Sequence, residues 1–483
     1  MKAKSKCKTG TQNCLKTALL TGFCVCLLAG SAQAADDRGA PRTPIPQANA
    51  GTLEDSVYST INYSPRIKGF QEFRQAAIHE VGKARSGWLP RVDVRAGIGM
   101  EQWNDNRTRN YPQLSSQNNY DFYERRDASV VASQTIWDGL STKARHDIAT
   151  SKVSSAESRL LDNTTALSLD AILAHIEVVR QIQLVKLAES NVENHKRILV
   201  SQNERQELGA ASLADVTQTQ SRLARAQSTL AESQAALETA ASNYRRLTGK
   251  VPRGLVAPAM PANSYSSLES VLASGQALNP KITALRWDIE TAKATVDLSK
   301  SNFHPHIFVE YSYNYNYQTQ SDTDWNDGHA FMLRLQWNIF NGFYDWYDTK
   351  SGLATERQRR REMEETRILI IEETEKTWAD FQSEQERTSH FLSAVEYGSQ
   401  TRDMYIEQFN LGQRSLLDVL DGENEVFTSS QQHVNSSMNA IANAYRLLAI
   451  GGELIAGFGV KGQDLYVDTD TSTWIWGNKK NKF

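Results

Sequence analysis

An internal duplication runs through most of the 483-residue sequence. Matching residues recur at an offset of 215 in the first part of the repeat and at an offset of 203 farther along. The first series pairs Thr52-Leu53 with Ser267-Leu268, Pro65 with Pro280 and Leu89-Pro90 with His304-Pro305. The second series pairs Ile136–Gly139 with Ile339–Gly342, Leu208-Gly209 with Leu411-Gly412, Ser212 with Ser415 and Asp215-Val216 with Asp418-Val419. A period this long does not build a solenoid, so we expect two similar halves of one fold, 51–250 and 267–456, joined by a linker at 251–266.

Each half contains two segments in which apolar and polar residues alternate, a pattern typical of β-strands with one apolar face. Runs near ten residues with this period suit membrane-spanning strands, and their aromatic residues suit interfacial girdles. A soluble sandwich with one wet face is the alternative. The expected strand pairs lie at about 90–137 and 305–340, with polar loops at 104–126 and 318–328.

The residues between the strand pairs have the pattern of long helices. Ser141 to Glu207 contains neither Pro nor Gly, and a helix of that length extends about 100 Å. After Gly209, a helix from about Leu213 carries one seam of large and one seam of small residues at heptad spacing, which favours closely approaching coiled-coil helices. The second half repeats this plan around Gly412. We therefore expect long helix pairs at about 140–248 and 343–456.

The two ends of the chain have their own patterns. Five lysines precede an apolar run, and Ala32-Gln33-Ala34 follows it, so we expect a signal peptide at 1–34 that is cleaved between Ala34 and Ala35. An N-terminal extension at 35–50 and a C-terminal tail at 457–483 complete the expected organisation. All four cysteines lie in the expected signal, which leaves the mature chain without disulfides, thiolate metal sites or a cysteine nucleophile.

The charge and motif content exclude several classes of function. Removal of the five signal lysines leaves 53 − 5 = 48 basic against 56 acidic residues, an acidic balance that argues against nucleic-acid binding. The remaining chain has no run of about 18 apolar residues, so no transmembrane helix is expected. Hydrolase and phosphate-loop motifs are absent from the sequence, and we expect neither enzymatic activity nor a metal or cofactor site.

Four strands per chain cannot close a membrane barrel. Bacterial barrels have at least about eight strands, and an open edge in lipid leaves backbone groups without hydrogen-bond partners. Two chains would supply eight strands, whose side chains fill the interior, and three would supply twelve, which leave a lumen. The long helices would then continue the shared barrel as a tube.

The sequence resembles the TolC-like outer-membrane factor family over about residues 50–457. The resemblance rests on the two-fold repeat, on Leu-Gly-x-x-Ser-Leu-x-Asp-Val at Leu208–Val216 and again at Leu411–Val419, and on the Trp-Asp-Gly and Phe-Asn-Gly strand ends. The segments Leu89–Asp93 and Gln134–Gly139 look most like the type I secretion branch. The resemblance implies a mixed α and β fold: a homotrimer with a 12-stranded outer-membrane β-barrel, four strands from each chain, and a periplasmic α-helical coiled-coil barrel.

The resemblance also implies a location and partners. The protein would lie in the outer membrane of a Gram-negative bacterium, in contact with its lipid, and extend into the periplasm. A periplasmic adaptor (membrane-fusion) protein and an inner-membrane ABC transporter would dock at its tip, and an exported protein such as a large adhesin would pass through. Two alternatives stay open: the channel of a multidrug or metal efflux pump, and a structural or adhesive periplasmic coiled-coil protein.

The residues expected to control the channel lie around the two Gly breaks. Asp418 and Asp421 share one helix face, and threefold symmetry would make them two acidic rings whose crowded carboxylates raise each other's pKa and favour cations. The resemblance implies gate aspartates here and a latch between Arg414 and Asp215. It also implies a different set of latch contacts at Phe409, because a tyrosine at this position can support the latch through a hydrogen bond from its hydroxyl. Ordinary helix capping is the alternative for these positions. The adaptor-docking tip turns implied by the resemblance contain Leu208, Gly209, Ser212, Leu411, Gly412 and Ser415.

Overall fold

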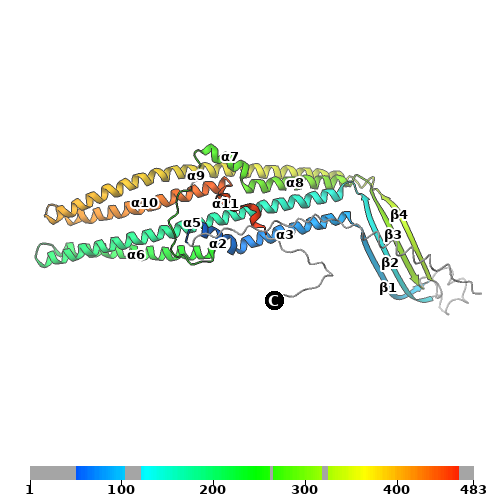
Figure 1. Ribbon diagram of the computed structural model, residues 1–483, viewed down its shortest axis with the longest axis horizontal. Coiled ribbons are helices and arrows are strands. Elements are labelled where there is room, and N and C mark those ends of the chain that lie inside the picture. Colours follow the sequence, from blue (N-terminus) through cyan, green and yellow to red (C-terminus); the bar gives the residue numbers. More distant parts are fainter. Residues whose placement is uncertain (1–50, 104–120, 262–264, 318–324, 467–483) are drawn as a thin grey trace, which may run out of the picture. The chain divides into compact units, whose positions relative to one another are not determined.

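The computed structural model describes residues 51–103, 121–261, 265–317 and 325–466. The chain divides into two units, of which residues 45–469 contain every described element. The other unit, residues 1–44 with 470–483, lies outside the described residues, as do the expected signal peptide with its Ala34–Ala35 cleavage site and the expected N-terminal extension. The described part is mostly helical and contains one four-stranded antiparallel sheet (Figure 1).

The two halves repeat the same order of elements. The first half consists of α2 (Leu53–Tyr63), α3 (Pro65–Arg85), η1 (Ser86–Trp88), β1 (Arg91–Trp103), β2 (Asp121–Trp137), α5 (Ser141–Glu207) and α6 (Leu213–Thr248). The second consists of α7 (Leu268–Leu278), α8 (Pro280–Ser301), β3 (His306–Tyr317), β4 (Trp325–Gln336), α9 (Tyr344–Asn410) and α10 (Leu416–Ile450). Two short elements follow, α11 (Leu454–Gly457) and η2 (Gly462–Leu465).

The repeated residues are those that begin the helices. The Thr52 hydroxyl accepts a hydrogen bond from the backbone of α2, and Ser267 does the same for α7. Pro65 and Pro280 occupy the first helical positions of α3 and α8, where a missing N–H costs no hydrogen bond and the fixed φ of proline suits a helix. The duplication therefore preserves the local chemistry that sets the helix boundaries.

The sheet has the order β1-β2-β3-β4, with every neighbouring pair antiparallel. Three expected boundaries are wrong: β2 and β4 begin inside the segments expected to be polar loops, and β4 ends at Gln336 rather than near 340. Cross-strand contacts explain the longer strands, because the side chains of Asn316 and Asn326 share a hydrogen bond of 2.9 Å and Arg126 lies over the Tyr317 ring.

One face of the sheet is mainly apolar and the other is mainly polar. With exceptions such as Val131, Phe308 and Met332, the cross-strand registers put the apolar strand residues on one face, which also carries the Glu124–Arg126 ion pair near the start of β2. That face contains Val92, Val94, Ile98, Met100, Val130, Ala132, Tyr311, Tyr313, Phe331, Leu333 and Leu335. The opposite face carries ion pairs, including Arg125 with Glu101 and Arg334 with Glu310. A sheet so divided suits a boundary between an apolar medium and a polar interior.

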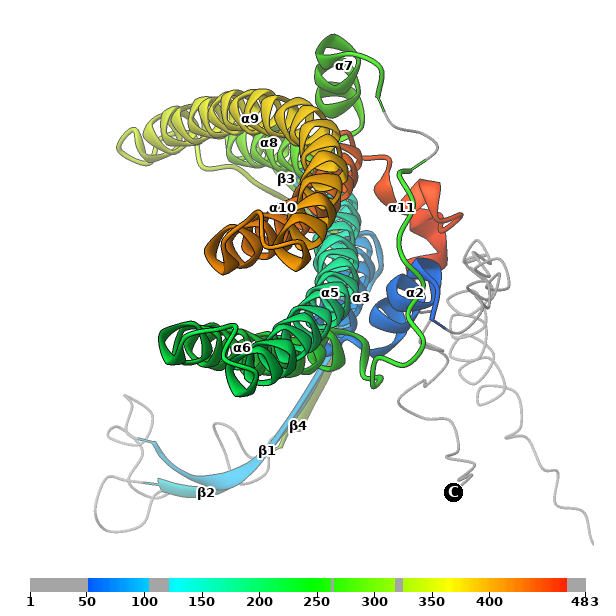
Figure 2. The ribbon, with the colours of Figure 1, turned by 90° about the vertical axis from the view of Figure 1, so that its left-hand side faces the viewer.

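The helices form two antiparallel hairpins, α5 with α6 and α9 with α10 (Figures 1 and 2). Helix α5 also packs against α3, α8 and α10, so the halves meet along it. The main core gathers apolar residues of both halves, among them Leu160, Ile172, Ile176, Tyr244 and Leu448. No helix in the described part of the chain combines the length and the apolar composition that a bilayer crossing requires.

The end of the described chain belongs to this core. Leu454, Val460 and Leu465 are almost fully buried in it, and the Tyr58 hydroxyl donates a 2.6 Å hydrogen bond to the carbonyl of Phe458. The boundary expected at 457 for a C-terminal tail is therefore too early, because residues up to 466 are packed. Residues 467–483 lie outside the described residues.

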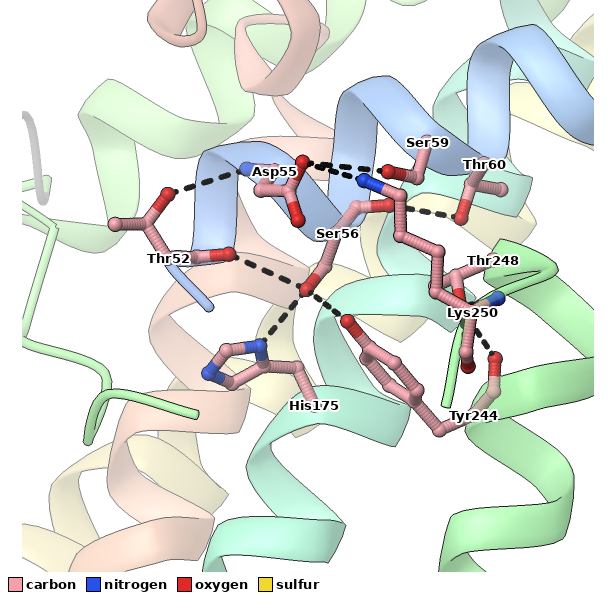
Figure 3. A network of polar contacts seen from close by, with 9 residues as sticks. All are labelled: Thr52, Asp55, Ser56, Ser59, Thr60, His175, Tyr244, Thr248 and Lys250. Atoms are coloured by element: carbon pink, nitrogen blue, oxygen red, sulfur yellow. Dashed lines mark hydrogen bonds and ion pairs between the residues drawn. The ribbon is translucent and has the colours of Figure 1, made fainter. Parts of the chain in front are cut away.

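A buried polar network attaches α2 and the linker to the first hairpin (Figure 3). Ser56 Oγ lies 2.9 Å from both His175 Nδ1 and the Tyr244 hydroxyl, and His175 Nε2 lies 2.9 Å from the carbonyl oxygen of Val256. Burial lowers the pKa of His175, against the smaller opposing effect of the Val256 hydrogen bond. The ring is therefore neutral, with Nε2–H donating to Val256 and Nδ1 accepting from Ser56.

Candidate functional site

The two hairpin turns have nearly the same backbone geometry. Gly209 and Gly412 have φ of +72° and +75°, a left-handed conformation that glycine adopts without the steric cost of a side chain. The N–H of the following residue bonds back to the helix in each turn, Ala210 to Arg205 and Gln413 to Gln408, at 2.7 and 2.8 Å. A Cβ on either glycine would have open space around it. The turns therefore require glycine for its backbone conformation.

A capping box follows each glycine. Asp215 Oδ2 accepts hydrogen bonds from the backbone N–H and hydroxyl of Ser212, at 3.1 and 2.8 Å, and Ser212 Oγ accepts from the N–H of Asp215. Ser415 and Asp418 make the same three contacts at the start of α10. These reciprocal bonds satisfy backbone donors that a helix start otherwise leaves open. The capping expected as the alternative role of Asp215 and Asp418 is thus present in both turns.

The pKa of Asp418 differs in direction from the sequence expectation. Hydrogen bonds from the side chain and backbone of Ser415 lower it, and the charge of Arg414 contributes further in the same direction. Crowding between carboxylates of neighbouring chains would act in the opposite sense. Within one chain, the capping hydrogen bonds keep Asp418 charged.

Arg414 and Asp215 do not contact each other in the described chain. The Arg414 guanidinium lies 3.0 Å from Gln408 Oε1 and 3.7 Å from Asp418, and it covers the Tyr405 ring at 4.4 Å. Asp215 is held by Ser212. The latch expected between these two residues is therefore not made inside the chain, because each side chain has a nearer partner.

Near the turns, two arginines of the first half connect the hairpins instead. Arg205 lies over the Phe409 ring at 4.3 Å and donates a 3.1 Å hydrogen bond to Asn410. Arg222 Nη2 lies 3.0 Å from Asp421 Oδ1. Phe409 thus has a partner that suits an aromatic ring. Sequence spacing did not single out Arg205 or Arg222, because each partner is about 200 residues away. The available signal was one arginine on either side of the Gly209 break, four residues before it and thirteen residues after it.

A polar groove of about 600 Å³ lies between α5, α9 and α10, close to these connections. Glu423 is buried in it, where Asn194 donates a 3.1 Å hydrogen bond to Oε2 and Arg402 lies 3.8 Å from Oε1. Such partners offset the cost of burying a carboxylate. The described residues contain no group of three or more His, Cys, Asp or Glu side chains that could hold a metal ion.

The sheet with one apolar face and the two long hairpins with matched turns define an outer-membrane channel subunit. Residues 58–250 and 272–453 match the outer membrane efflux protein family, and the chain belongs to this family. The expected family, the mixed α and β fold and the outer-membrane location are confirmed. Members of the family are channels rather than enzymes, which argues against the alternatives of a soluble sandwich and an adhesive coiled-coil protein.

Individual relatives are distant in sequence and close in fold. The outer membrane efflux protein BepC of Brucella suis is 21% identical over 329 residues, which cover 68% of this chain and 72% of BepC. The outer membrane protein VceC of Vibrio cholerae has a TM-score of 0.69 at 17% identity, covering 84% of this chain and 96% of VceC. The CmeC outer membrane channel of Campylobacter jejuni has a TM-score of 0.70 at 13% identity, covering 83% and 86%.

Proposed function

We propose that three copies of this chain form the exit duct of a tripartite secretion machine, with an adaptor and an inner-membrane ABC transporter as partners. The observation that carries the assembly is an imbalance between the two longest helices. Helices α5 and α9 each have 67 residues, yet 22 residues are buried in α5 and five in α9. Equivalent helices of a duplicated fold are expected to have equivalent packing partners, so a large part of the α9 surface is left unpacked in a single chain.

The repeat identifies the missing cover. Helix α5 contacts α3 and α6 of its own half and α8 and α10 of the other half, whereas α9 contacts α8 and α10. The elements equivalent to α8 and α10 are α3 and α6, so α9 should pack against α3 and α6 of a second copy. A contact of this kind, repeated around an axis, closes a ring.

Individual side chains support this arrangement. Ile368 and Tyr397 on α9 are 58% and 66% exposed. Their counterparts at the 203-residue offset are Thr165, which is buried, and Asn194, which bonds to Glu423 of α10. Phe73 on α3 is 54% exposed, and its counterpart Asp288 bonds to Ser155 of α5 at 2.7 Å. The contact between Ser155 and Asp288 thus predicts a contact between Gln358 of one copy and Phe73 of the next.

The sheet supports the same assembly. β1 and β4 are its edge strands among the described elements, and an edge strand in lipid needs a partner for its backbone groups. Pairing β4 of each copy with β1 of the next would give 3 × 4 = 12 strands, enough to leave a lumen. The polar face with its ion pairs would line that lumen, and the apolar face would meet lipid.

Cysteine crosslinking tests the assembly. Phe73→Cys with Gln358→Cys should produce covalent trimers on oxidation in the outer membrane. The matched control is Ser155→Cys with Asp288→Cys, which should crosslink within single chains only. All native cysteines lie in residues 1–34, so no other thiol of the described chain competes. A control pair that crosslinks while the test pair stays monomeric would refute the proposed interface.

We also propose that the molecule passing through the channel is an exported protein. The segments Leu89–Asp93 and Gln134–Gly139 support passage of an exported protein, as in type I secretion. The relative BepC is named an outer membrane efflux protein, which supports a second candidate function, a channel for small molecules. Deletion of the gene distinguishes them: loss of one exported protein from the medium with unchanged drug and metal susceptibility supports secretion. Increased susceptibility with unchanged protein export would instead identify an efflux channel.

A further inference from the structure

Asp421 has a basic partner that comes from the other half of the chain. Arg222 on α6 places Nη2 3.0 Å from Asp421 Oδ1 on α10. The Arg222 side chain is 28% exposed and the Asp421 side chain is 59% exposed, so the arginine is the more firmly enclosed member of the pair. Asp421 therefore presents its charge to solvent together with a neighbouring positive charge.

The repeat does not generate this pair. At the 203-residue offset, the counterpart of Asp421 is Gln218 and the counterpart of Arg222 is Glu425. The acid belongs to the second half alone and the arginine to the first half alone. The ion pair is therefore specific to the junction between the two hairpins of one chain, unlike the capping boxes, which both halves possess.

We propose that Arg222 is a specificity-determining residue of the channel, which neutralises Asp421 and so limits the negative charge at the hairpin turns. This inference rests on the proposed function, because it needs an ion path past these turns. Three copies would bring three Asp421 and three Arg222 side chains to one level, with little net charge. At distances greater than the 3.0 Å between the paired atoms, the fields of the two opposite charges largely cancel, and water and salt weaken the remaining field.

The two partners have opposite effects in this arrangement. Replacement of Arg222 by an uncharged residue exposes the Asp421 carboxylate and adds negative charge. Replacement of Asp421 exposes the guanidinium and adds positive charge. A residue that only stabilises the turn would give changes in the same direction for both replacements, because each variant breaks the same contact.

Planar-bilayer recordings of the full, purified channel measure this charge. Arg222→Gln should raise the cation-to-anion permeability ratio by about twofold or more, the factor for one added charge roughly 10 Å from an ion in water. It should also strengthen block by multivalent cations. Asp421→Asn should lower the ratio by a similar factor. Arg245→Gln is the matched control, because Arg245 is an exposed arginine about 35 Å farther along the same helix, beyond the screening length of salt, and it should leave the ratio near that of the wild type.

A charge exchange and a crosslink complete the test. Arg222→Asp combined with Asp421→Arg should restore the wild-type permeability ratio. Arg222→Cys combined with Asp421→Cys should form a crosslink within one chain, a readout that does not depend on conductance. If Arg222→Gln leaves the permeability ratio unchanged while Asp421→Asn alters it, the proposed role of Arg222 is refuted, whereas the proposed channel function is not. A wild type that assembles but conducts no ions would overturn the proposed function, and this inference with it.

Discussion

At the scale of single residues, the buried histidines make the stability of the protein depend on pH. Burial lowers the pKa of both His175 and His195, and the charge of Arg222 lowers that of His195 further. Between its lowered pKa and the ordinary value of about 6.5, each histidine is neutral in the folded protein and protonated in the unfolded chain. The free energy of unfolding is therefore at its full value above about pH 6.5 and falls as the pH drops.

The His175 network allows this dependence to be measured. The melting temperature of the wild type should fall between pH 7.5 and pH 5.5. His175→Gln should flatten this change without abolishing it, because His195 still contributes. His390→Gln on the exposed surface of α9 is the control and should preserve the wild-type slope. A His175→Gln slope equal to that of the wild type would show that the network does not titrate.

The contact between Arg205 and Phe409 predicts a change in gating. A cation–π contact at an exposed site contributes about 0.5–1 kcal/mol, so its loss in Phe409→Ala should raise the open probability by about two- to fivefold. Phe409→Tyr retains the aromatic ring and should remain near the wild type. Single-channel recordings measure the open probability of each variant. If the open probability is unaltered in both Phe409→Ala and Arg205→Ala, the contact between these residues has no role in gating.

At the scale of elements, local signals determined the helix ends and distant partners determined the strand ends. Gly209 and Ser212 lie within a few residues of the boundaries that they set, so the ends of α5 and α6 could be predicted from the sequence to within about one residue. The starts of β2 and β4 could not, because their polar residues gain support from partners on other strands. The same reason hid the pairs of Arg205 and Arg222.

The glycine turns can be tested as elements. Gly209→Ala should destabilise the α5–α6 turn by about 1–2 kcal/mol, because alanine resists the left-handed conformation. Hydrogen exchange of the backbone amides at 205–216 should accelerate accordingly. Gly82→Ala in α3 is the control: its φ lies outside the left-handed range and the space around it is open. That substitution should stabilise the helix by about 0.5–1 kcal/mol. Unchanged exchange in Gly209→Ala would mean that the turn tolerates a side chain.

At the scale of the whole molecule, the sequence predicted the repeat, the sheet and the family, but it did not show how unequally the two long helices are covered. That inequality distinguishes two apolar residues of α9 that are similarly exposed in one chain, Ile368 and Leu392 at 58% and 55%. The α5 counterpart of Ile368 is the buried Thr165, and that of Leu392 is the exposed Glu189. Only Ile368 should therefore face another copy.

The comparison predicts opposite outcomes for one type of substitution. Ile368→Asp should shift the purified protein from trimers toward single chains, because it places an unpaired charge in the proposed interface. Leu392→Asp should leave assembly intact. Light scattering of the detergent-solubilised protein measures both masses. Equal behaviour of the two variants would contradict the mapping of α5 surroundings onto α9.

The equal lengths of α5 and α9 limit how this gene can change. One residue inserted into α5 alone would rotate Gly209 by about 100° and move it by about 1.5 Å relative to Gly412. The capping boxes, the Arg205–Phe409 contact and the Arg222–Asp421 pair would then lose their alignment together. Insertions and deletions in one copy of the duplicated segment should persist in evolution only when the other copy acquires a matching one.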